Sequence, residues 1–379
     1  MEALAYVNSS LVVMRAPSPV TLNKAGANYR SEVPFLEYHP QAAYLEWLAM
    51  CDAVLACRGD ALVHFEDQDE RFLDVEHLRV MADGTIVSDD SSEPLGTVND
   101  VLTGRVFSAN GPWVIVEGRR MRALLPNMLT HRTAELPYYE HLLAEIADAC
   151  DLELKLSRNP YRWEGMADVV VCGERAILTY TVRGHYDKGV PQKTLRSSLE
   201  GANYAKEFAH LGPEACVFAE LVYPHFHGDT VQFTLRTSDG PFLMAYPEGL
   251  FPGCDETVIR AIGEERLLRI DKIDAVEHYA ANSRQIEEGV LVPDRVSAAF
   301  TDQLIACGRR PHPVGLTELF GKAGGGPGCA TLYLPHNLEL PPTFAARYST
   351  QQKQAHARTS RVARTLRVES GFYVGRSRG

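Results

Sequence analysis

Short β-type runs alternate with amphipathic helical stretches along this chain of 379 residues, and this alternation limits the fold more than any other feature. The β-type runs are rich in Val, Ile, Thr and aromatic residues and end at turn residues. Strands are expected at 10–17, 112–118, 168–173, 175–181, 215–223, 230–235 and 289–293. Apolar periodicity predicts helices at 42–56, 138–151, 199–212, 255–268 and 294–308. The recurring order is a strand pair followed by a helix, which differs from the strand–helix–strand order of a doubly wound parallel sheet.

Composition excludes several classes of protein. The chain is 45% hydrophobic and 23% charged, which is typical of a globular protein, and its length suits two or three domains or one large α/β unit. No window approaches the roughly 18 consecutive apolar residues of a membrane span, and the N-terminus lacks the basic segment of a signal peptide. The net charge of −11 argues against a nucleic-acid partner.

The eight cysteines are scattered along the chain and include no Cys-x-x-Cys pair. This pattern disfavours both a disulfide framework and a structural zinc site, and it favours a reducing cytoplasm. Cys329 differs from the others because it ends the sequence Gly-Gly-Gly-Pro-Gly-Cys, whose glycines allow the backbone to approach a ligand closely. A thiol beside turn N–H groups can act as a nucleophile, although a lone cysteine is more often structural.

Three further segments carry polar residues next to strands. His227 and Asp229 follow each other at a spacing that places both on one face of an extended segment. A metal site would use His225 and His227 together, but no other Cys or His cluster completes a tetrahedral set, and a surface loop is an equally good interpretation. Glu164 and Asp168 flank a bend, where a carboxylate can orient a histidine or bind a cation.

Asn110 completes the set, although Asn at a turn is common for purely local reasons. Taken in order, Asn110, Trp163-Glu164-Gly165 to Asp168, His227-Gly228-Asp229-Thr230 and the glycine-led Cys329 resemble the guanidine-modifying superfamily. This superfamily includes amidinotransferases, arginine deiminases, dimethylarginine hydrolases, and arginine and succinylarginine dihydrolases. Segments 120–142 and 279–293 also resemble it, so the likeness covers about 105–335 and, more loosely, the opening strand.

The resemblance implies a pentein-type α/β propeller, in which five ββαβ units surround a pseudo-fivefold axis and the active site lies in the central channel. It therefore predicts a single catalytic domain at 1–350, with a polar surface insertion at about 83–100. Residues 351–379 form a predicted basic tail, either a solvated or packed terminal helix or a docking segment for an acidic partner.

The resemblance also implies roles for the site residues. Cys329 would attack the guanidino carbon, His227 would move protons, Glu164 would orient His227, and Asp229 would bind guanidinium N–H groups. Asp168 is a further expected substrate ligand, although Glu-Gly-Met-Ala-Asp is one residue longer than the common Glu-Gly-Gly-Asp form. This chemistry requires no metal and no organic cofactor.

The position of Asn110 is an aspartate in deiminases and many transferases but an asparagine in dihydrolases. An amide both donates and accepts hydrogen bonds, so a ureido intermediate could stay bound and be attacked again. The resemblance therefore favours a dihydrolase-like hydrolase of arginine or an arginine-like compound that releases ammonia. The alternatives are an amidinotransferase with an amine acceptor, a single-step deiminase, and a non-catalytic propeller that serves as a binding protein.

The groups that would hold the far end of the substrate are less well defined. Arg196 resembles a segment that binds the substrate carboxylate in relatives, but the extra residues 185–193 precede it. Arg132 is a second candidate, and for both a structural salt bridge is as good an interpretation. The sequence leaves open the exact substrate and whether the chain forms a homo-oligomer.

Overall fold

A computed structural model describes residues 11–20, 38–57, 62–66, 70–73, 75–98, 104–183, 186–187, 190–191, 195–335, 338, 340–341, 353–357 and 365–369. Five three-stranded sheets form its body, and each has the same topology. The first strand pairs antiparallel with the middle strand, which pairs parallel with the third. A helix connects the second strand to the third in every unit. The strand-pair-and-helix order of the sequence is therefore a structural repeat.

Four units follow one another along the chain. The first contains β6 (Trp113–Glu117), β7 (Arg120–Leu125), α3 (Leu136–Ala149) and β8 (Glu153–Arg158). The second contains β9 (Val169–Cys172), β10 (Arg175–Tyr180), α4 (Leu199–Phe208) and β13 (Cys216–Glu220). The third contains β14 (Gln232–Thr237), β15 (Gly240–Ala245), α5 (Cys254–Ile262) and β16 (Leu267–Arg269), and the fourth contains β17 (Arg284–Ile286), β18 (Gly289–Pro293), α7 (Ala298–Ala306) and β19 (Arg310–Val314).

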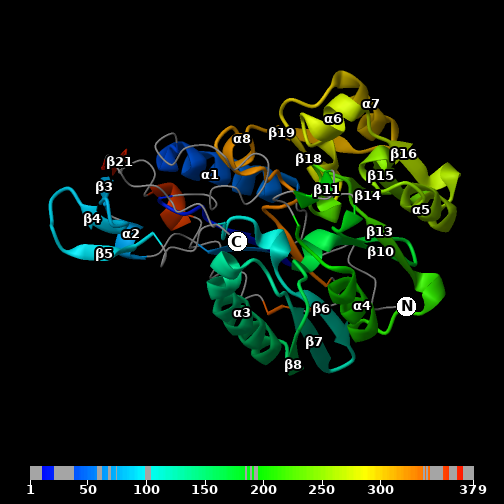
Figure 1. Ribbon diagram of the computed structural model, residues 1–379, viewed down its shortest axis with the longest axis horizontal. Coiled ribbons are helices and arrows are strands. Elements are labelled where there is room, and N and C mark those ends of the chain that lie inside the picture. The colour runs from blue at the N-terminus through cyan, green and yellow to red at the C-terminus, as the bar shows by residue number, and fades with distance from the viewer. Residues whose placement is uncertain are drawn as a thin grey trace.

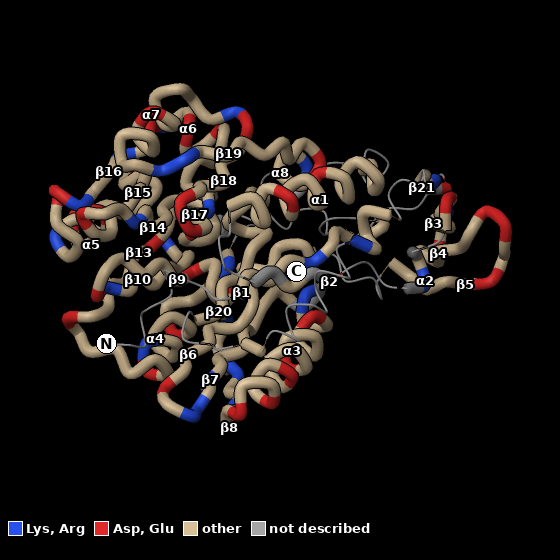
Figure 2. The backbone as a smooth tube through the Cα atoms, turned by 180° about the vertical axis from the view of Figure 1, so that it is seen from behind, with Lys and Arg blue, Asp and Glu red and all other residues tan. Residues whose placement is uncertain are grey.

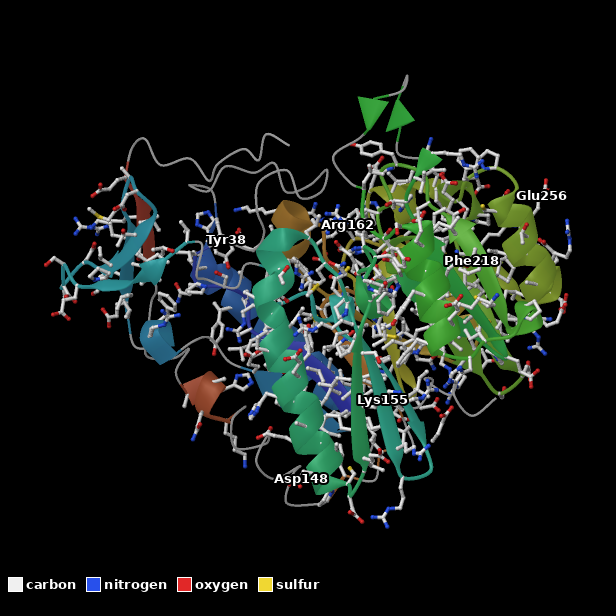
Figure 3. All side chains as sticks on the ribbon, turned by 60° about the horizontal axis from the view of Figure 1, so that its bottom comes forward. Tyr38, Asp148, Lys155, Arg162, Phe218 and Glu256 are labelled. Atoms are coloured by element: carbon white, nitrogen blue, oxygen red, sulfur yellow. The ribbon has the colours of Figure 1, made fainter. Side chains whose placement is uncertain are left out.

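The fifth unit joins the two ends of the chain. Its first strand is β20 (Leu332–Leu334), and β1 (Leu11–Arg15), α1 (Pro40–Cys57) and β2 (Leu62–Glu66) complete it. Figure 1 shows the sheets fanned about the middle of the molecule, with α3, α4, α5 and α7 on the outside. Figure 3 shows that Asp148 on α3 and Glu256 on α5 point outward from this body.

Each helix packs against its own unit and the unit before it. Trp47 of α1, for example, shares a core with Leu291 of β18, and the buried face of α3 shares one with Leu11 of β1. The same relation holds for α4 with β6, α5 with β9 and α7 with β14. Helix α1 of the fifth unit contacts the fourth unit, and helix α3 of the first unit contacts the fifth unit. The five apolar cores therefore close into a ring.

Local sequence explains where several elements begin and end. The hairpins β6–β7 and β9–β10 turn at Gly118 (φ 58°) and Gly173 (φ 61°), a left-handed conformation that favours glycine. The expectation of one helix at 255–268 is wrong, because α5 ends at Ile262, Gly263 adopts φ 94°, and β16 begins at Leu267. The apolar residues that suggested a longer helix belong to the edge strand β16.

A separate small sheet stands beside the ring. It contains β3 (His77–Val80), β4 (Thr85–Ser88), β5 (Pro94–Thr97) and β21 (Thr365–Val368), with α2 (Glu70–Leu73) next to it. Figure 1 shows it at the left edge, and Figure 2 shows acidic residues on the loop between β4 and β5. The sheet has its own apolar cluster, which includes Phe72, Leu78 and Ile86.

The 83–100 segment therefore contributes β4 and β5 to this sheet, and the tail contributes β21, which runs parallel to β3. The boundaries 1–350 and 351–379 stay predictions, and much of the tail lies outside the described residues. The remaining short elements are β11 (Tyr186–Asp187), β12 (Val190–Pro191), α6 (Lys272–Val276) and α8 (Leu319–Ala323). Among the described residues, no helix is both long enough and apolar enough to cross a membrane.

Candidate active site

Six of the predicted site residues lie on or beside turns that precede the first strand of a unit, namely Asn110, Glu164, Asp168, His227, Asp229 and Cys329, whereas Arg132 and Arg196 lie before the helices α3 and α4. Four of these turns are 3-10 helices, namely η3 (Ser108–Asn110), η5 (Gly165–Asp168), η8 (Gly228–Thr230) and η11 (Ala280–Asn282), and the fifth is the glycine turn that ends at Cys329. Since the units form a ring, the five turns meet at its centre. Sequence segments more than 200 residues apart are thereby brought into one site.

A closed circuit of hydrogen bonds joins each turn to the next. The circuit consists of Ala109 N to Cys329 O (2.9 Å), Met166 N to Gly111 O (3.2 Å), Gly228 N to Asp168 Oδ1 (3.1 Å), Asn282 Nδ2 to Asp229 O (2.9 Å) and Gly328 N to Asn282 O (2.7 Å). Every turn therefore has a partner on both sides, and the positions of the catalytic candidates are mutually fixed.

The glycine turn fits closely against protein groups. A Cβ on Gly325 would lie 2.0 Å from a ring carbon of Phe107, and one on Gly326 would lie 2.9 Å from Asn282 Oδ1. Gly324 adopts φ 74° and ends α8. In the described structure Phe107 and Asn282 approach these glycines closely, and an approach of this backbone to a ligand stays a prediction.

The Cys329 thiol is buried between an amide and a carboxylate. Its Sγ accepts from Asn282 Nδ2 at 3.2 Å and donates to Asp229 Oδ2 at 3.3 Å. Burial and the nearby Asp229 charge raise the pKa of Cys329 well above its ordinary value, and burial also raises the pKa of Asp229. The thiol is therefore protonated at neutral pH in this arrangement.

His227, Glu164 and Arg196 form a buried row. Glu164 Oε2 accepts from His227 Nε2 at 2.8 Å and from Arg196 Nη1 at 2.8 Å. Burial alone would raise the pKa of Glu164, but Arg196 and His227 hold it well below its usual range. Glu164 is therefore ionised, and it fixes His227 with Nε2–H toward the carboxylate, which leaves Nδ1 as the other ring nitrogen.

Asn110 is oriented by a second buried arginine. Arg132 Nη1 donates to Asn110 Oδ1 at 2.6 Å, while Glu135 accepts from Arg132 through both oxygens, at 2.7 and 2.8 Å. Asn110 Nδ2 consequently faces the site, where it donates to the carbonyl oxygen and to Oε2 of Glu164, both at 3.2 Å, and lies 3.3 Å from His227 Nε2. The donor end of this amide, not its acceptor end, is the part directed at the catalytic candidates.

Asp168 accepts hydrogen bonds from three protein groups. These are Thr179 Oγ1 at 2.8 Å, Gly228 N at 3.1 Å and the Ser197 hydroxyl. Burial raises the pKa of Asp168 to about 6, against the opposing effect of His227 and the two hydroxyl donors. The structure thus brings Asp168 beside the backbone that carries His227, and all of these hydrogen-bond partners belong to the protein.

Asn282 is a site residue that the sequence reasoning missed. Its Oδ1 accepts from Gly326 N at 2.9 Å and from Cys329 N at 3.0 Å, in addition to the bonds of its Nδ2 to Cys329 and Asp229. A signal was present in the sequence, because Ser-Ala-Asn at 108–110 and Ala-Ala-Asn at 280–282 both precede a β-type run. The structure places these two tripeptides at equivalent positions in the first and fourth units.

Three buried polar atoms of the site have no hydrogen-bond partner among the described residues. They are Glu164 Oε1, Asp229 Oδ1 and His227 Nδ1. Buried polar atoms normally have partners, so two free carboxylate oxygens, one of them on the residue that contacts the thiol, indicate a ligand that donates several N–H groups. Within the described ranges, no group of three or more His, Cys, Asp or Glu side chains could hold a metal ion.

No protein-family model and no curated protein sequence matches the chain. The chain is, however, similar to several solved structures. The N-terminal domain of ArgZ, an arginine dihydrolase from cyanobacteria, in a cysteine-to-serine variant bound to substrate, has a TM-score of 0.62 at 19% identity, over 85% of this chain and 97% of that one. A variant of AgrE bound to L-arginine has a TM-score of 0.62 at 18% identity, over 87% and 41% of the two chains.

DDAH from Pseudomonas aeruginosa, in complex with citrulline, has a TM-score of 0.58 at 15% identity, over 86% of this chain and 99% of that one. The present chain has the pentein α/β-propeller fold. This confirms the fold class expected from the resemblance to guanidine-modifying enzymes. The likeness spans 42% of the ArgZ chain in its apo structure, so it does not extend over that whole chain.

Proposed function

We propose that this protein is a cysteine-dependent hydrolase of arginine or an arginine-like guanidino compound, and that it releases ammonia. The observation that carries the proposal is a pair of unpartnered buried carboxylate oxygens. Asp229 Oδ1 belongs to the residue that accepts from the thiol of Cys329, and Glu164 Oε1 belongs to the residue that holds His227. A guanidinium group is planar, carries a positive charge and has several N–H donors, so it satisfies both oxygens and offers its carbon to the sulfur.

Substrate binding would itself activate the nucleophile. The charge of Asp229 and burial keep the thiol protonated in the empty site. A bound guanidinium neutralises Asp229 and lowers the pKa of Cys329, and His227 Nδ1 takes the thiol proton. The sulfur then forms a bond to the guanidino carbon, the C–N bond breaks, and His227 returns the proton to the departing ammonia.

Asn110 supports a second round of the same chemistry. Water attacks the amidino carbon, the C–S bond breaks, and a neutral ureido group remains in the site. Its carbonyl oxygen needs a donor, and Asn110 Nδ2 is held toward the site because Arg132 occupies Oδ1. An aspartate at this position would instead present an acceptor to that oxygen. We therefore favour a dihydrolase that converts one guanidino group to an amine, carbon dioxide and two ammonia molecules.

The buried arginines take positioning roles in this proposal. Arg196 keeps Glu164 ionised, and Arg132 fixes Asn110, so the carboxylate of the substrate would be bound by other groups. We also infer a reducing cytoplasm as the compartment, since all eight cysteines are free. An amine acceptor and a homo-oligomer stay predictions.

A product balance tests the proposal. The protein is incubated with L-arginine and a panel of guanidino compounds, with and without an added amine such as glycine, and ammonia and organic products are counted together. Two ammonia per amine product, absent in Cys329→Ala, is the expected result. One ammonia with a ureido product would identify a deiminase, and turnover only with the added amine would identify an amidinotransferase. No turnover by the wild type on any compound would contradict an enzymatic role.

A further inference from the structure

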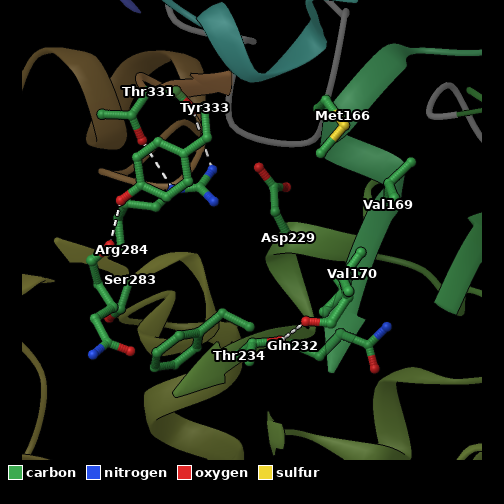
Figure 4. Close-up of a pocket in the computed structure, with 13 residues that line it drawn as sticks. Met166, Val169, Val170, Asp229, Gln232, Thr234, Ser283, Arg284, Thr331 and Tyr333 are labelled. Atoms are coloured by element: carbon green, nitrogen blue, oxygen red, sulfur yellow. Dashed lines mark hydrogen bonds between the residues drawn. The ribbon is translucent and has the colours of Figure 1, made fainter. Parts of the chain in front are cut away.

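A cavity of about 90 Å³ adjoins the proposed site. Its walls are the first strands of four units and the turns before them, and Figure 4 shows Asp229 between Arg284 on one side and Met166 on the other. The lining residues follow the catalytic turns in the sequence. Thr331 lies two positions after Cys329, Ser283 lies one after Asn282, and Gln232 lies three after Asp229. The cavity therefore extends from the level of the turns along the inner strands, away from the ring of catalytic groups.

Asp229 belongs to both the site and the cavity. Its Oδ2 accepts from Cys329, its Oδ1 has no described partner, and its side chain lines the cavity. A molecule in the cavity can therefore approach the carboxylate that contacts the nucleophile. Three lining residues, Thr234, Gln285 and Tyr333, are half-buried, so the part of the cavity that they line borders the surface.

One of the residues along the cavity is a buried glutamine whose amide has no described hydrogen-bond partner. Gln232 is fully buried, and among the described residues neither atom of its amide has a hydrogen-bond partner. Val169 and Val171 supply an apolar wall, while Arg284 is engaged with Thr331 and Gly328. Unpartnered buried amide groups of this kind are normally satisfied by ordered water.

We propose that this cavity is the route by which hydrolytic water reaches the intermediate on Cys329. The proposal rests on the hydrolase function above. While the carbon is bound to sulfur, the organic remainder of the substrate occupies the path by which the substrate arrived, and each hydrolytic step still consumes one water. A water from the cavity passes Asp229, its oxygen bonds to the amidino carbon, its proton goes to His227, and the sulfur leaves as thiolate.

Two substitutions test this route. Gln232→Leu keeps a similar side-chain volume but removes the amide that holds water. Thr234→Phe narrows the half-buried end of the cavity. Thr237→Phe is the matched control, because it makes the same exchange on β14 outside the lining. Rapid quenching followed by peptide mass spectrometry measures the fraction of Cys329 that carries the adduct in the steady state.

Both cavity variants should lower kcat about fivefold or more, lower KM in proportion so that kcat/KM stays within about twofold, and increase the adduct fraction, since only the step that consumes water after adduct formation is slowed. Thr237→Phe should match the wild type. A raised KM with unchanged kcat would overturn the proposal, because the cavity would then hold substrate. Wild-type kinetics in both variants would overturn it as well and leave the hydrolase intact, whereas a wild type without turnover would overturn both inferences.

Discussion

Asn110 and Asn282 occupy equivalent turns in two units, yet their surroundings differ. Arg132 donates a hydrogen bond to Oδ1 of Asn110, so that Nδ2 of Asn110 points toward Glu164 and His227. The Oδ1 atom of Asn282 accepts from two backbone N–H groups of the glycine turn, and its Nδ2 atom donates to Asp229 O and Cys329 Sγ. One amide is thus oriented by the scaffold for chemistry, while the other holds the scaffold around the nucleophile.

This difference shows how a repeated fold builds an asymmetric site. The five turns share a backbone position, so each supplies a side chain to the centre of the ring. What separates the two asparagines is the partner that fixes them, a buried arginine in one case and the glycine turn in the other. Substitutions at the two positions should therefore affect different properties of the protein.

The largest effect is expected for Asn282→Ala. This change leaves the N–H groups of Gly326 and Cys329 without their acceptor, and each buried unsatisfied group costs about 1–3 kcal/mol. The free energy of unfolding should fall by roughly 3 kcal/mol, with nearly complete loss of turnover. Urea denaturation measures the first effect. The control Asn127→Ala, at an exposed asparagine, should change neither the free energy of unfolding nor the turnover. A stable and active Asn282→Ala protein would contradict the structural role assigned to Asn282.

Asn110→Asp should change the products more than the stability. The added carboxylate lies next to Glu164, where Arg132 compensates part of the charge, but the donor toward the site is lost. Turnover should fall about 10- to 100-fold, and the ratio of ammonia to organic product should move from two toward one. An unchanged ratio in this variant would remove Asn110 from the second hydrolytic step.

The two groups that contact the Cys329 thiol, Asp229 and Asn282, should affect its reactivity in opposite directions. Asp229 raises its pKa, whereas the hydrogen bond from Asn282 lowers it. In Asp229→Asn the pKa of Cys329 should fall, so alkylation by iodoacetamide should begin at a lower pH and run about tenfold faster at neutral pH for each pKa unit. The pH profile of labelling at Cys329, resolved from the other cysteines by peptide mass spectrometry, checks the sign. A profile displaced to higher pH would contradict the assigned charge of Asp229.

Arg132→Lys should have the smallest effect of the four. Lysine keeps the charge near Glu135 but cannot bond both of its oxygens and Asn110 in the same geometry. We expect kcat to fall about tenfold or less, with no change in the labelling profile of Cys329, since Arg132 has no described contact with the thiol. A displaced labelling profile would show that the two asparagine environments are coupled.

The sequence predicted the inner parts of the molecule better than the outer ones. Strands such as Trp113–Glu117 and Gly289–Pro293 are continuous apolar runs because they are buried on both faces. The third strands differ in burial: Cys216–Glu220 is mostly buried and was expected from its apolar run, whereas Glu153–Arg158 and the proline-containing Arg310–Val314 are largely exposed or half-buried and lack such a run. The pairing of β20 with β1 joins distant segments, which no local pattern could indicate.

The same limit applies to the site. Cys329, His227, Glu164, Asn110 and Asp229 were predicted as a set from motifs, and the structure brings them together on adjoining turns. A structural salt bridge was one interpretation of both Arg132 and Arg196, and Glu135 lies only three residues after Arg132. The contacts of Arg132 with Asn110 and of Arg196 with Glu164 join residues 22 and 32 positions apart, which no local pattern indicates. Asn282 was recognisable only once the two Ala-Asn turns were compared as repeats.

Covalent capture tests the central claim most directly. The protein is mixed with L-arginine or the most active compound of the panel, quenched in acid within the first turnovers, digested and examined by mass spectrometry. We expect an amidino adduct on the peptide that contains Cys329, with no adduct on the other seven cysteines and none in Cys329→Ala. Turnover that persists in Cys329→Ala, or an adduct on a different cysteine, would contradict the assignment of Cys329 as the nucleophile.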